Sequence, residues 1–202
     1  MSDKEIPASE VKRLRELTGA GMMECKRALQ DSDGDIDRAQ EILRERGLAG
    51  VEKRRSRVAG DGVIESYIHG EGRIGVLVEV NCETDFVART PQFRELAREL
   101  AMQVAARAPR WVSRDEVPEE VAASERKVYA ERAHQLGKPE NLLDRIVDGM
   151  LEDFYKETVL LDQVYIRDDS KSVDDLVKDV ASKVGENVVV RRFVRYQLGE
   201  EA

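Results

Sequence analysis

The middle of the chain contains the feature that most restricts its fold, a strand pattern followed closely by a helix pattern. Between residues 74 and 80 every second residue is Ile or Val, which is the period of a strand with one buried face. Thr90 and Pro91 then offer a capping side chain and a first helical residue that needs no amide hydrogen. Apolar residues recur with helical period over residues 93–104. A helix of this kind can cover the apolar face of a sheet, so the pattern predicts an α+β fold.

The residues around this unit predict the remaining elements. A second strand pattern covers residues 63–68, and the Gly-rich residues 70–73 between the two patterns are typical of a hairpin loop. Further along the chain we expect helices at about 119–135, 141–157 and 172–184, an extended segment at 159–166 and a final strand at 188–198. The predicted architecture is a three- or four-stranded antiparallel sheet with helices on one side.

The first 47 residues predict a separate bundle of three short helices. Breaks fall at residues 18–21 and 31–34, and Asp35 can accept hydrogen bonds from the free amides that open the third helix. Gly47 stands where a left-handed residue would end that helix. The expected inner faces consist of Val11, Leu14, Leu17, Cys25, Ala28, Leu29, Ile36, Ala39 and Leu43. We expect a head at residues 1–47, a linker at 48–61 and a core domain at 62–202.

Composition limits the partners that such a chain can have. Its 33 Lys and Arg residues against 41 Asp and Glu residues give a net charge of −8, whereas nucleic-acid-binding proteins usually carry a basic excess. The basic run at residues 53–57 predicts a solvated helix or linker face, and an RNA-binding patch is the alternative that stays open. No apolar run approaches the roughly 18 residues of a membrane span, and residues 1–5 lack the pattern of a secretory signal. We therefore expect a cytoplasmic protein that contacts neither a membrane nor, directly, nucleic acid.

Little in the sequence points to catalysis. It lacks the glycine-rich nucleotide-binding and metalloprotease motifs, and its two cysteines and two histidines are too few for a usual metal site. Cys82 is expected to be a buried thiol at the end of a strand. Glu79, Glu83 and Asp85 cluster around the end of that strand, so an acid–base or cation-binding role stays open as an alternative. We expect a protein that is not an enzyme and needs neither a cofactor nor a metal ion.

Two connecting segments stand out on physical grounds. In residues 18–23, Met22 and Met23 begin a helix, and their side chains point in different directions. Either one of them is a core residue and the other is exposed by accident, or the two form a docking face. In residues 81–89, Phe86 follows Asp85 between the clearest strand and the clearest helix. Pattern alone leaves two interpretations of Phe86. It is packed in the core beside a turn capped by Thr84 or Asp85, or it is an exposed aromatic anchor.

The same two segments carry a resemblance to a known family. Residues 11–29, VKRLRELTGAGMMECKRAL, are similar to the opening signature of bacterial elongation factor Ts. Residues 76–89, VLVEVNCETDFVAR, are similar to its second signature. DGVI at 61–64, GKP at 137–139 and VRRFVRYQLG at 190–199 also resemble family members, so the resemblance covers nearly the whole chain.

This resemblance implies a translation elongation factor that exchanges guanine nucleotide on elongation factor Tu, binding its GDP-bound and nucleotide-free forms. It implies a head similar to a ubiquitin-associated domain, which docks on the partner's nucleotide-binding domain. The matching docking positions are Leu14, Arg15, Gly21, Met22 and Met23. The positions that match the element displacing the partner's magnesium ion are Thr84, Asp85, Phe86 and Val87.

The chain also departs from longer members of the family. These carry an extra core half and a helical-hairpin insertion, and 202 residues leave no room for both. The resemblance is therefore to the short form, which is expected to form a homodimer, with the last strand as the candidate contact. Residues 148–153 are more acidic than the corresponding family stretch, where basic residues are common.

Overall fold

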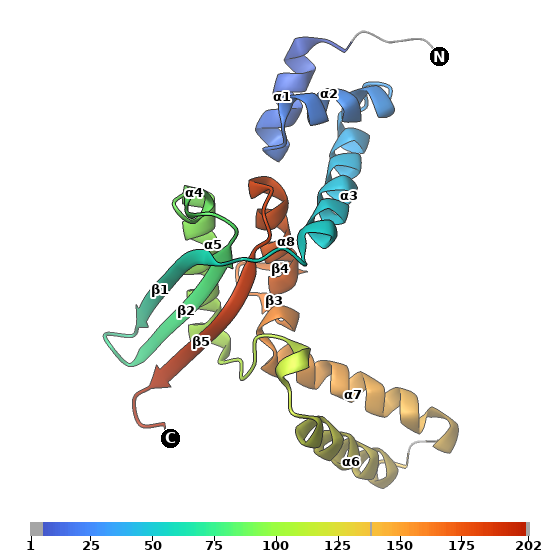
Figure 1. Cartoon of the computed structure of the whole chain (residues 1–202). Coiled ribbons are helices and arrows are strands. Elements are labelled where there is room, and N and C mark those ends of the chain that lie inside the picture. Colours follow the sequence, from blue (N-terminus) through green and yellow to red (C-terminus); the bar gives the residue numbers. More distant parts are fainter. Residues whose placement is uncertain (1–5, 138, 201–202) are drawn as a thin grey trace.

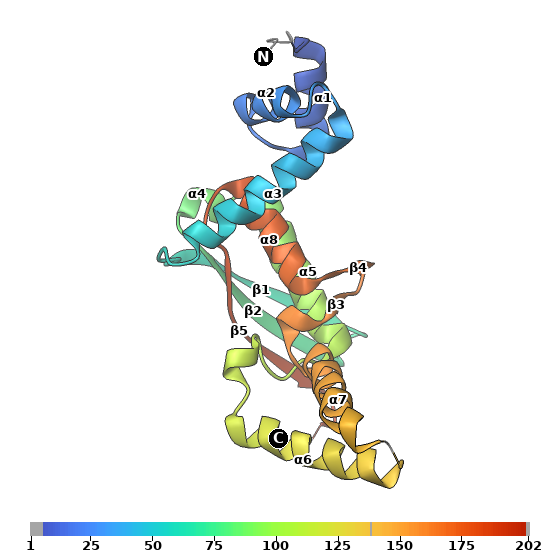
Figure 2. The ribbon, with the colours of Figure 1, turned by 90° about the vertical axis from the view of Figure 1, so that its right-hand side faces the viewer.

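The computed structural model describes residues 6–137 and 139–200. The chain forms an elongated molecule with a helical head, a central sheet backed by helices, and a projecting pair of helices (Figures 1 and 2). Helices and an antiparallel sheet are present together, which confirms the predicted α+β class. The signal-peptide prediction at residues 1–5 and Lys138 of the GKP match lie outside the described residues.

The head consists of α1 (Ala8–Thr18), α2 (Met22–Asp31) and α3 (Ile36–Arg54). Leu14, Cys25 and Leu29 are completely buried between the helices, as their spacing predicts. The Asp35 carboxylate accepts a hydrogen bond from the Arg38 amide at 3.0 Å, which confirms the predicted cap of α3. Leu17, however, is 57% exposed, so its predicted place on the inner face of α1 is wrong.

The predicted end of the third helix at Gly47 is wrong, because α3 continues to Arg54. Gly47 lies where α3 crosses α8 (Val173–Val184), and a β-carbon at Gly47 would collide with the Ser182 hydroxyl group and approach its β-carbon to 3.3 Å. The glycine therefore allows two helices to approach closely rather than ending one of them. Residues 48–54, predicted as linker, are helical, while the division into head, linker and core stays a proposal.

The central sheet has the strand order β1 (Asp61–His69), β2 (Ile74–Cys82) and β5 (Val189–Gln197), with both pairs antiparallel. Its inner face packs against α5 (Pro91–Arg107) and buries the alternating residues of β2. The Thr90 hydroxyl oxygen accepts a hydrogen bond from the Phe93 amide at 3.3 Å, as the cap of α5 requires. The hairpin, the helix and the final strand are thus confirmed, and the sheet has three strands.

The remaining elements flank this layer. A short pair of strands, β3 (Val164–Tyr165) and β4 (Asp168–Ser172), forms a separate sheet. Residues 159–166 were expected to be extended, but only Val164 and Tyr165 form a strand, and a 3₁₀ turn, η3 (Leu160–Asp162), occupies the first half of the range. The short helix α4 (Asp85–Ala88) follows β2, and η1 (Arg114–Glu116) and η2 (Glu140–Leu142) are further 3₁₀ turns.

The helices α6 (Glu119–Gln135) and α7 (Leu143–Thr158) lie side by side and project away from the sheet, at the end opposite the head (Figures 1 and 2). Their existence was predicted, with bounds within two residues, but their pairing as a hairpin was not. Part of the acidic stretch at 148–153 is neutralised within this region, since Asp148 pairs with Arg126 at 2.6 Å and Glu152 with Arg114 at 2.7 Å. None of the helices in the described ranges has the length and apolarity needed to cross a membrane.

Candidate partner-binding site

The segment that follows β2 folds into a single capped helical turn. Thr84 has an extended backbone, with φ −135° and ψ 154°, and its hydroxyl oxygen accepts a hydrogen bond from the Val87 amide at 3.4 Å. This is the geometry of a helix N-cap, so Thr84 and not Asp85 caps α4. The Thr84 cap therefore helps to order the backbone of the predicted site within the folded chain.

Phe86 projects from this turn into solvent. Its exposed fraction is 80%, whereas Val87 packs partly against the main core and Ala88 is only 4% exposed. The two residues after Phe86 therefore anchor the turn, and the aromatic ring is left outside. Of the two interpretations that the sequence leaves open, the structure contradicts the buried Phe86 and supports the exposed one.

Asp85 lies at the surface beside the ring. Its carboxylate forms an ion pair with Arg89 at 2.8 Å, in the i and i+4 positions of a helical turn, and both side chains are substantially exposed. A solvent-exposed pair of this kind contributes at most about 1 kcal/mol, so Asp85 can exchange this partner for another at small cost.

The structure does not bring Glu79, Glu83 and Asp85 together as an acid–base or cation-binding site. Glu79 pairs with Arg192 at 2.7 Å across the sheet, whereas the Glu83 carboxylate accepts from the Asn187 amide at 2.7 Å, so the clustered acids do not converge. Cys82 is completely buried at the end of β2, as predicted. Its burial, and to a smaller extent the negative charge of Glu186, raise the pKa of the thiol to about 11. Among the described residues no group of three His, Cys, Asp or Glu side chains is placed to hold a metal ion.

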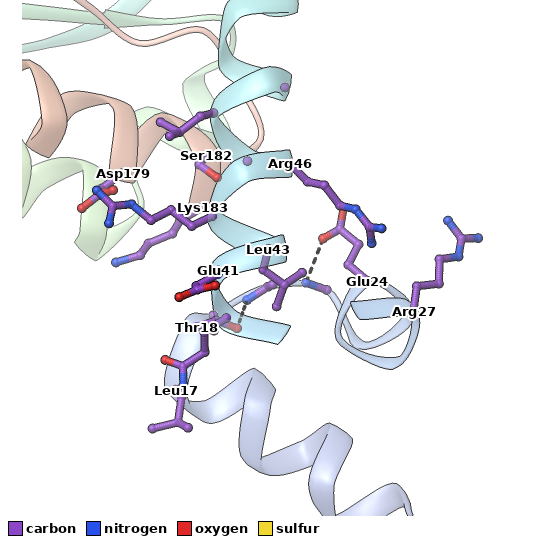
Figure 3. Close-up of a pocket in the computed structure, with 18 of the residues that line it drawn as sticks. Leu17, Thr18, Glu24, Arg27, Glu41, Leu43, Arg46, Asp179, Ser182 and Lys183 are labelled. Atoms are coloured by element: carbon purple, nitrogen blue, oxygen red, sulfur yellow. Dashed lines mark hydrogen bonds between the residues drawn. The ribbon is translucent and has the colours of Figure 1, made fainter. Parts of the chain in front are cut away.

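The loop between α1 and α2 is also fixed by local hydrogen bonds. Gly19 ends α1 with φ 71°, and the Thr18 hydroxyl oxygen accepts from the Ala20 amide at 3.3 Å. The Glu24 carboxylate accepts from the Gly21 amide at 3.1 Å and so closes the start of α2 (Figure 3). This loop leads directly into the two methionines at the start of α2.

The predicted docking residues of the head do not all lie at its surface. Met22 and Met23 are 45% and 60% exposed, and Arg15 and Gly21 are also exposed. Leu14 is completely buried, so it supports α1 from within the head and presents nothing to a partner in this conformation. The interpretation of one methionine as a core residue is contradicted, because neither Met22 nor Met23 belongs to the core of the head.

A cleft of about 1040 Å³ is lined by residues of the head loop, α2, α3 and α8 (Figure 3). Its lining contains both charges, with Arg27 and Lys183 as well as Glu41 and Asp179. Such a lining favours neither an anion nor a cation. The exposed apolar side chains therefore remain the better candidates for the functional site.

The two exposed segments lie on different parts of the chain and at the same end of the molecule. Both views place α4 at the end of the core that faces the head (Figures 1 and 2). Exposed aromatic and methionine side chains on ordered backbone are typical of surfaces that bind another protein. The exposed segments of the head and of the core are therefore the candidate contacts for another protein.

Comparison with known proteins identifies the family. The model of the family described as Elongation factor TS matches residues 3–200, and the chain therefore belongs to this family of translation elongation factors. Elongation factor Ts of Coprothermobacter proteolyticus is 56% identical over 196 residues, covering 97% of this chain and 100% of the relative. The protein of the same name from Caldanaerobacter subterraneus subsp. tengcongensis is 55% identical over 195 residues, with coverage of 96% and 98%. That of Thermotoga neapolitana is 52% identical over 197 residues, with coverage of 98% and 99%.

Proposed function

We propose that this chain is a guanine-nucleotide exchange factor that binds elongation factor Tu with GDP and promotes release of the nucleotide. The observation that carries this proposal is the exposure of Phe86, 80%, on a turn whose backbone is already capped and anchored. Membership of the elongation factor Ts family supports the choice of partner.

The turn at residues 84–87 acts on the magnesium and phosphate site of the partner. A magnesium ion bound to GDP is a large local positive charge, and its loss weakens the hold on the phosphates. Insertion of Phe86 between elements of the partner removes its ring from water and contributes about 2 kcal/mol. Asp85, released from its surface ion pair with Arg89, then reorganises polar groups beside the metal.

The head contributes a second contact through Arg15, Met22 and Met23. Methionine side chains adapt their shape to a partner surface, and Arg15 adds a charged group on the neighbouring helix. Gly21 lets the chain enter α2 at this surface, and Leu14 holds α1 in place from inside. We therefore assign docking to the exposed residues and support to Leu14.

Binding contacts alone can lower the barrier to GDP release enough, so the proposed exchange needs no covalent step on this chain. A thousandfold faster release corresponds to a barrier lowered by about 4 kcal/mol, which burial of Phe86 and docking of the head can supply together. By linkage, the factor by which the exchange factor weakens GDP is the factor by which GDP weakens the exchange factor. GTP binding then completes the exchange by displacing the factor.

We also propose that the core domain forms a homodimer through the uncovered face of the sheet. The pairing of strands places Leu77 between Ser66 and Val194, and Gly75 between Ile68 and Tyr196. Several large apolar side chains on this face are exposed, namely Ile64, Ile68, Leu77, Val194 and Tyr196. Figure 1 shows no helix over this face in the described part of the chain. An apolar patch of this kind is typical of a surface that another chain covers.

Release of fluorescent GDP from elongation factor Tu tests the exchange function. Substoichiometric amounts of this chain should accelerate release in the presence of excess unlabelled nucleotide, because each molecule acts repeatedly. Release at the same rate with and without the chain would refute the proposal. The cytoplasmic location and the absence of a direct nucleic-acid contact stay predictions, and salt-dependent RNA binding through residues 53–57 would contradict the latter.

A further inference from the structure

The loop between α8 and β5 lies beside the base of the Phe86 turn. Gly185 ends α8 in the left-handed conformation, with φ 74°, and the chain then passes through Glu186 and Asn187 into β5. Antiparallel pairing places Asn81 of β2 opposite Val189 of β5, which brings residues 186–187 next to residues 83–84. Two segments about 100 residues apart in the sequence therefore meet at this edge of the sheet.

Glu186 holds the first two residues of the turn with a single carboxylate. One oxygen accepts from the Glu83 amide at 3.0 Å and from the Thr84 amide at 3.1 Å. The other oxygen accepts from the Thr84 hydroxyl group at 2.6 Å. Hydrogen bonds to an ionised acceptor are about twice as strong as neutral ones, so these three bonds fix the backbone that enters α4.

The contact also determines how Thr84 caps the turn. A threonine hydroxyl group has one hydrogen to donate, and here it is directed to Glu186. A lone pair of the same oxygen is then left for the Val87 amide at 3.4 Å. Glu186 thereby orients the cap that sets the direction in which Phe86 projects.

Asn187 connects the same place to the chain segment that comes from the head. Its side-chain amide donates to the carbonyl oxygens of Arg55 at 3.3 Å and Arg57 at 2.8 Å, and its side chain is only 5% exposed. Its backbone amide donates to Glu83, which in turn lies 3.4 Å from the Arg57 guanidinium group. The base of the turn and the connection from the head therefore share one hydrogen-bonded cluster.

We propose that Glu186 is a positioning residue for nucleotide exchange, which acts by holding the Phe86 turn in the orientation that enters the partner. The proposal rests on the proposed exchange function. Glu186 itself contacts no nucleotide, and its effect passes through Thr84 to Phe86. Its removal should therefore reduce the contribution of Phe86 to the rate of GDP release and leave docking of the head intact.

The variants Glu186→Ala and Glu186→Gln test this role, with Glu99→Ala as the matched control. Glutamine keeps the size of Glu186, and its single carbonyl oxygen can still accept from the two amides, but its neutral NH2 group then faces the Thr84 hydroxyl group in place of an acceptor, so we expect an intermediate loss. Glu99 is also a partly buried glutamate, its partners are Tyr165 at 2.6 Å and Arg167 at 2.8 Å, and it lies on α5 away from the turn. The Glu99→Ala variant shows how far loss of a comparable carboxylate changes stability and exchange without affecting the turn directly.

Amide hydrogen exchange of the free protein measures the turn without any partner. Residues 83–88 should lose protection at least fivefold in Glu186→Ala and keep it in Glu99→Ala. Unchanged protection of this segment in Glu186→Ala would overturn the positioning role. This measurement stays valid even if the wild-type chain fails to release GDP from elongation factor Tu, an outcome that would refute the proposed function instead.

Kinetics of GDP release then separate positioning from stability. In Glu186→Ala the saturating release rate should fall about tenfold, while the concentration for half-maximal release changes less than twofold. In the Phe86→Ala background the same substitution should change the rate less than twofold, because the group that Glu186 positions is gone. An equal fold-loss in both backgrounds, or no loss with wild-type Phe86, would overturn the inference.

Discussion

Phe86→Ala is the substitution that separates function from folding most sharply. Because 80% of the Phe86 residue is exposed, truncation to alanine removes few contacts within the folded chain. Val87 and Ala88 continue to anchor the turn, and Thr84 continues to cap it. We therefore expect the free energy of unfolding to change by no more than about 0.5 kcal/mol, the range of ordinary surface substitutions.

The effect on exchange follows from the area that the ring has still to bury. Complete burial of a phenylalanine side chain contributes about 1.5–3 kcal/mol, and about four fifths of that burial remains available when the ring is 80% exposed. The loss is then about 2 kcal/mol, which corresponds to an approximately thirtyfold lower rate of GDP release. If the ring enters the partner only as the magnesium site opens, the whole loss appears in the saturating rate.

Stopped-flow release of fluorescent GDP, measured over a range of concentrations of the chain, gives this rate directly. Leu136→Ala is the control, because Leu136 is also an exposed apolar residue, 59%, at the far end of the projecting hairpin. A Phe86→Ala variant that remains folded and releases GDP at the wild-type saturating rate would refute the assignment of Phe86. A parallel loss in Leu136→Ala would show that the effect is not specific to the turn.

Three further predictions concern the fold and the assembly. Alanine usually stabilises a helix relative to glycine by about 1 kcal/mol, but Gly47→Ala should lower the melting temperature because of the collision with Ser182, and Ser182→Ala should restore it. Burial raises the pKa of the Cys82 thiol to about 11 from an ordinary 9.0, so the unfolded thiol loses its proton first, and the wild type should lose about 2 kcal/mol of unfolding free energy relative to Cys82→Ala between pH 9 and pH 11 in denaturant titrations. Leu77→Glu places a charge in the centre of the uncovered sheet face and should convert the proposed dimer to a monomer in sedimentation experiments, whereas a dimer of unchanged affinity would exclude this face.

Elements with strong local periodicity could be predicted from the sequence. The inner residues of α5 and β2 alternate with the period of their own element and face one continuous core, so local pattern and tertiary packing agree. The start of α8 could also be predicted from the sequence, because Ser172 and Asp175 form a capping box. The strand β4 has the sequence DDSKS, which carries no strand signal, and it forms only because β3 lies beside it.

Features that depend on distant contacts could not be predicted in this way. A glycine after a helical pattern usually marks a helix end, and nothing local in the sequence shows that Gly47 instead faces Ser182. The exposure of Phe86 was likewise undecided, since one apolar residue in a loop fits either a core or a surface position. Glu186 and Asn187 were missed because their partners are more than 100 residues away. Pairing of β5 with β2, combined with Gly185 as a helix end, is the signal that could have placed them near Thr84.

Insertion of the single Phe86 ring into a partner is favourable only if the backbone of residues 83–88 is ordered before binding. Fixing the backbone of one residue costs about 1–2 kcal/mol, so ordering the six residues 83–88 at the moment of contact would cost roughly 6–12 kcal/mol. Burial of Phe86 contributes about 2 kcal/mol, which is far too little to offset that cost. In this chain the ordering is completed during folding, by the Thr84 cap, by the three hydrogen bonds to Glu186 and by the burial of Ala88. The contacts that keep the turn rigid are therefore as necessary to the proposed exchange as the ring itself.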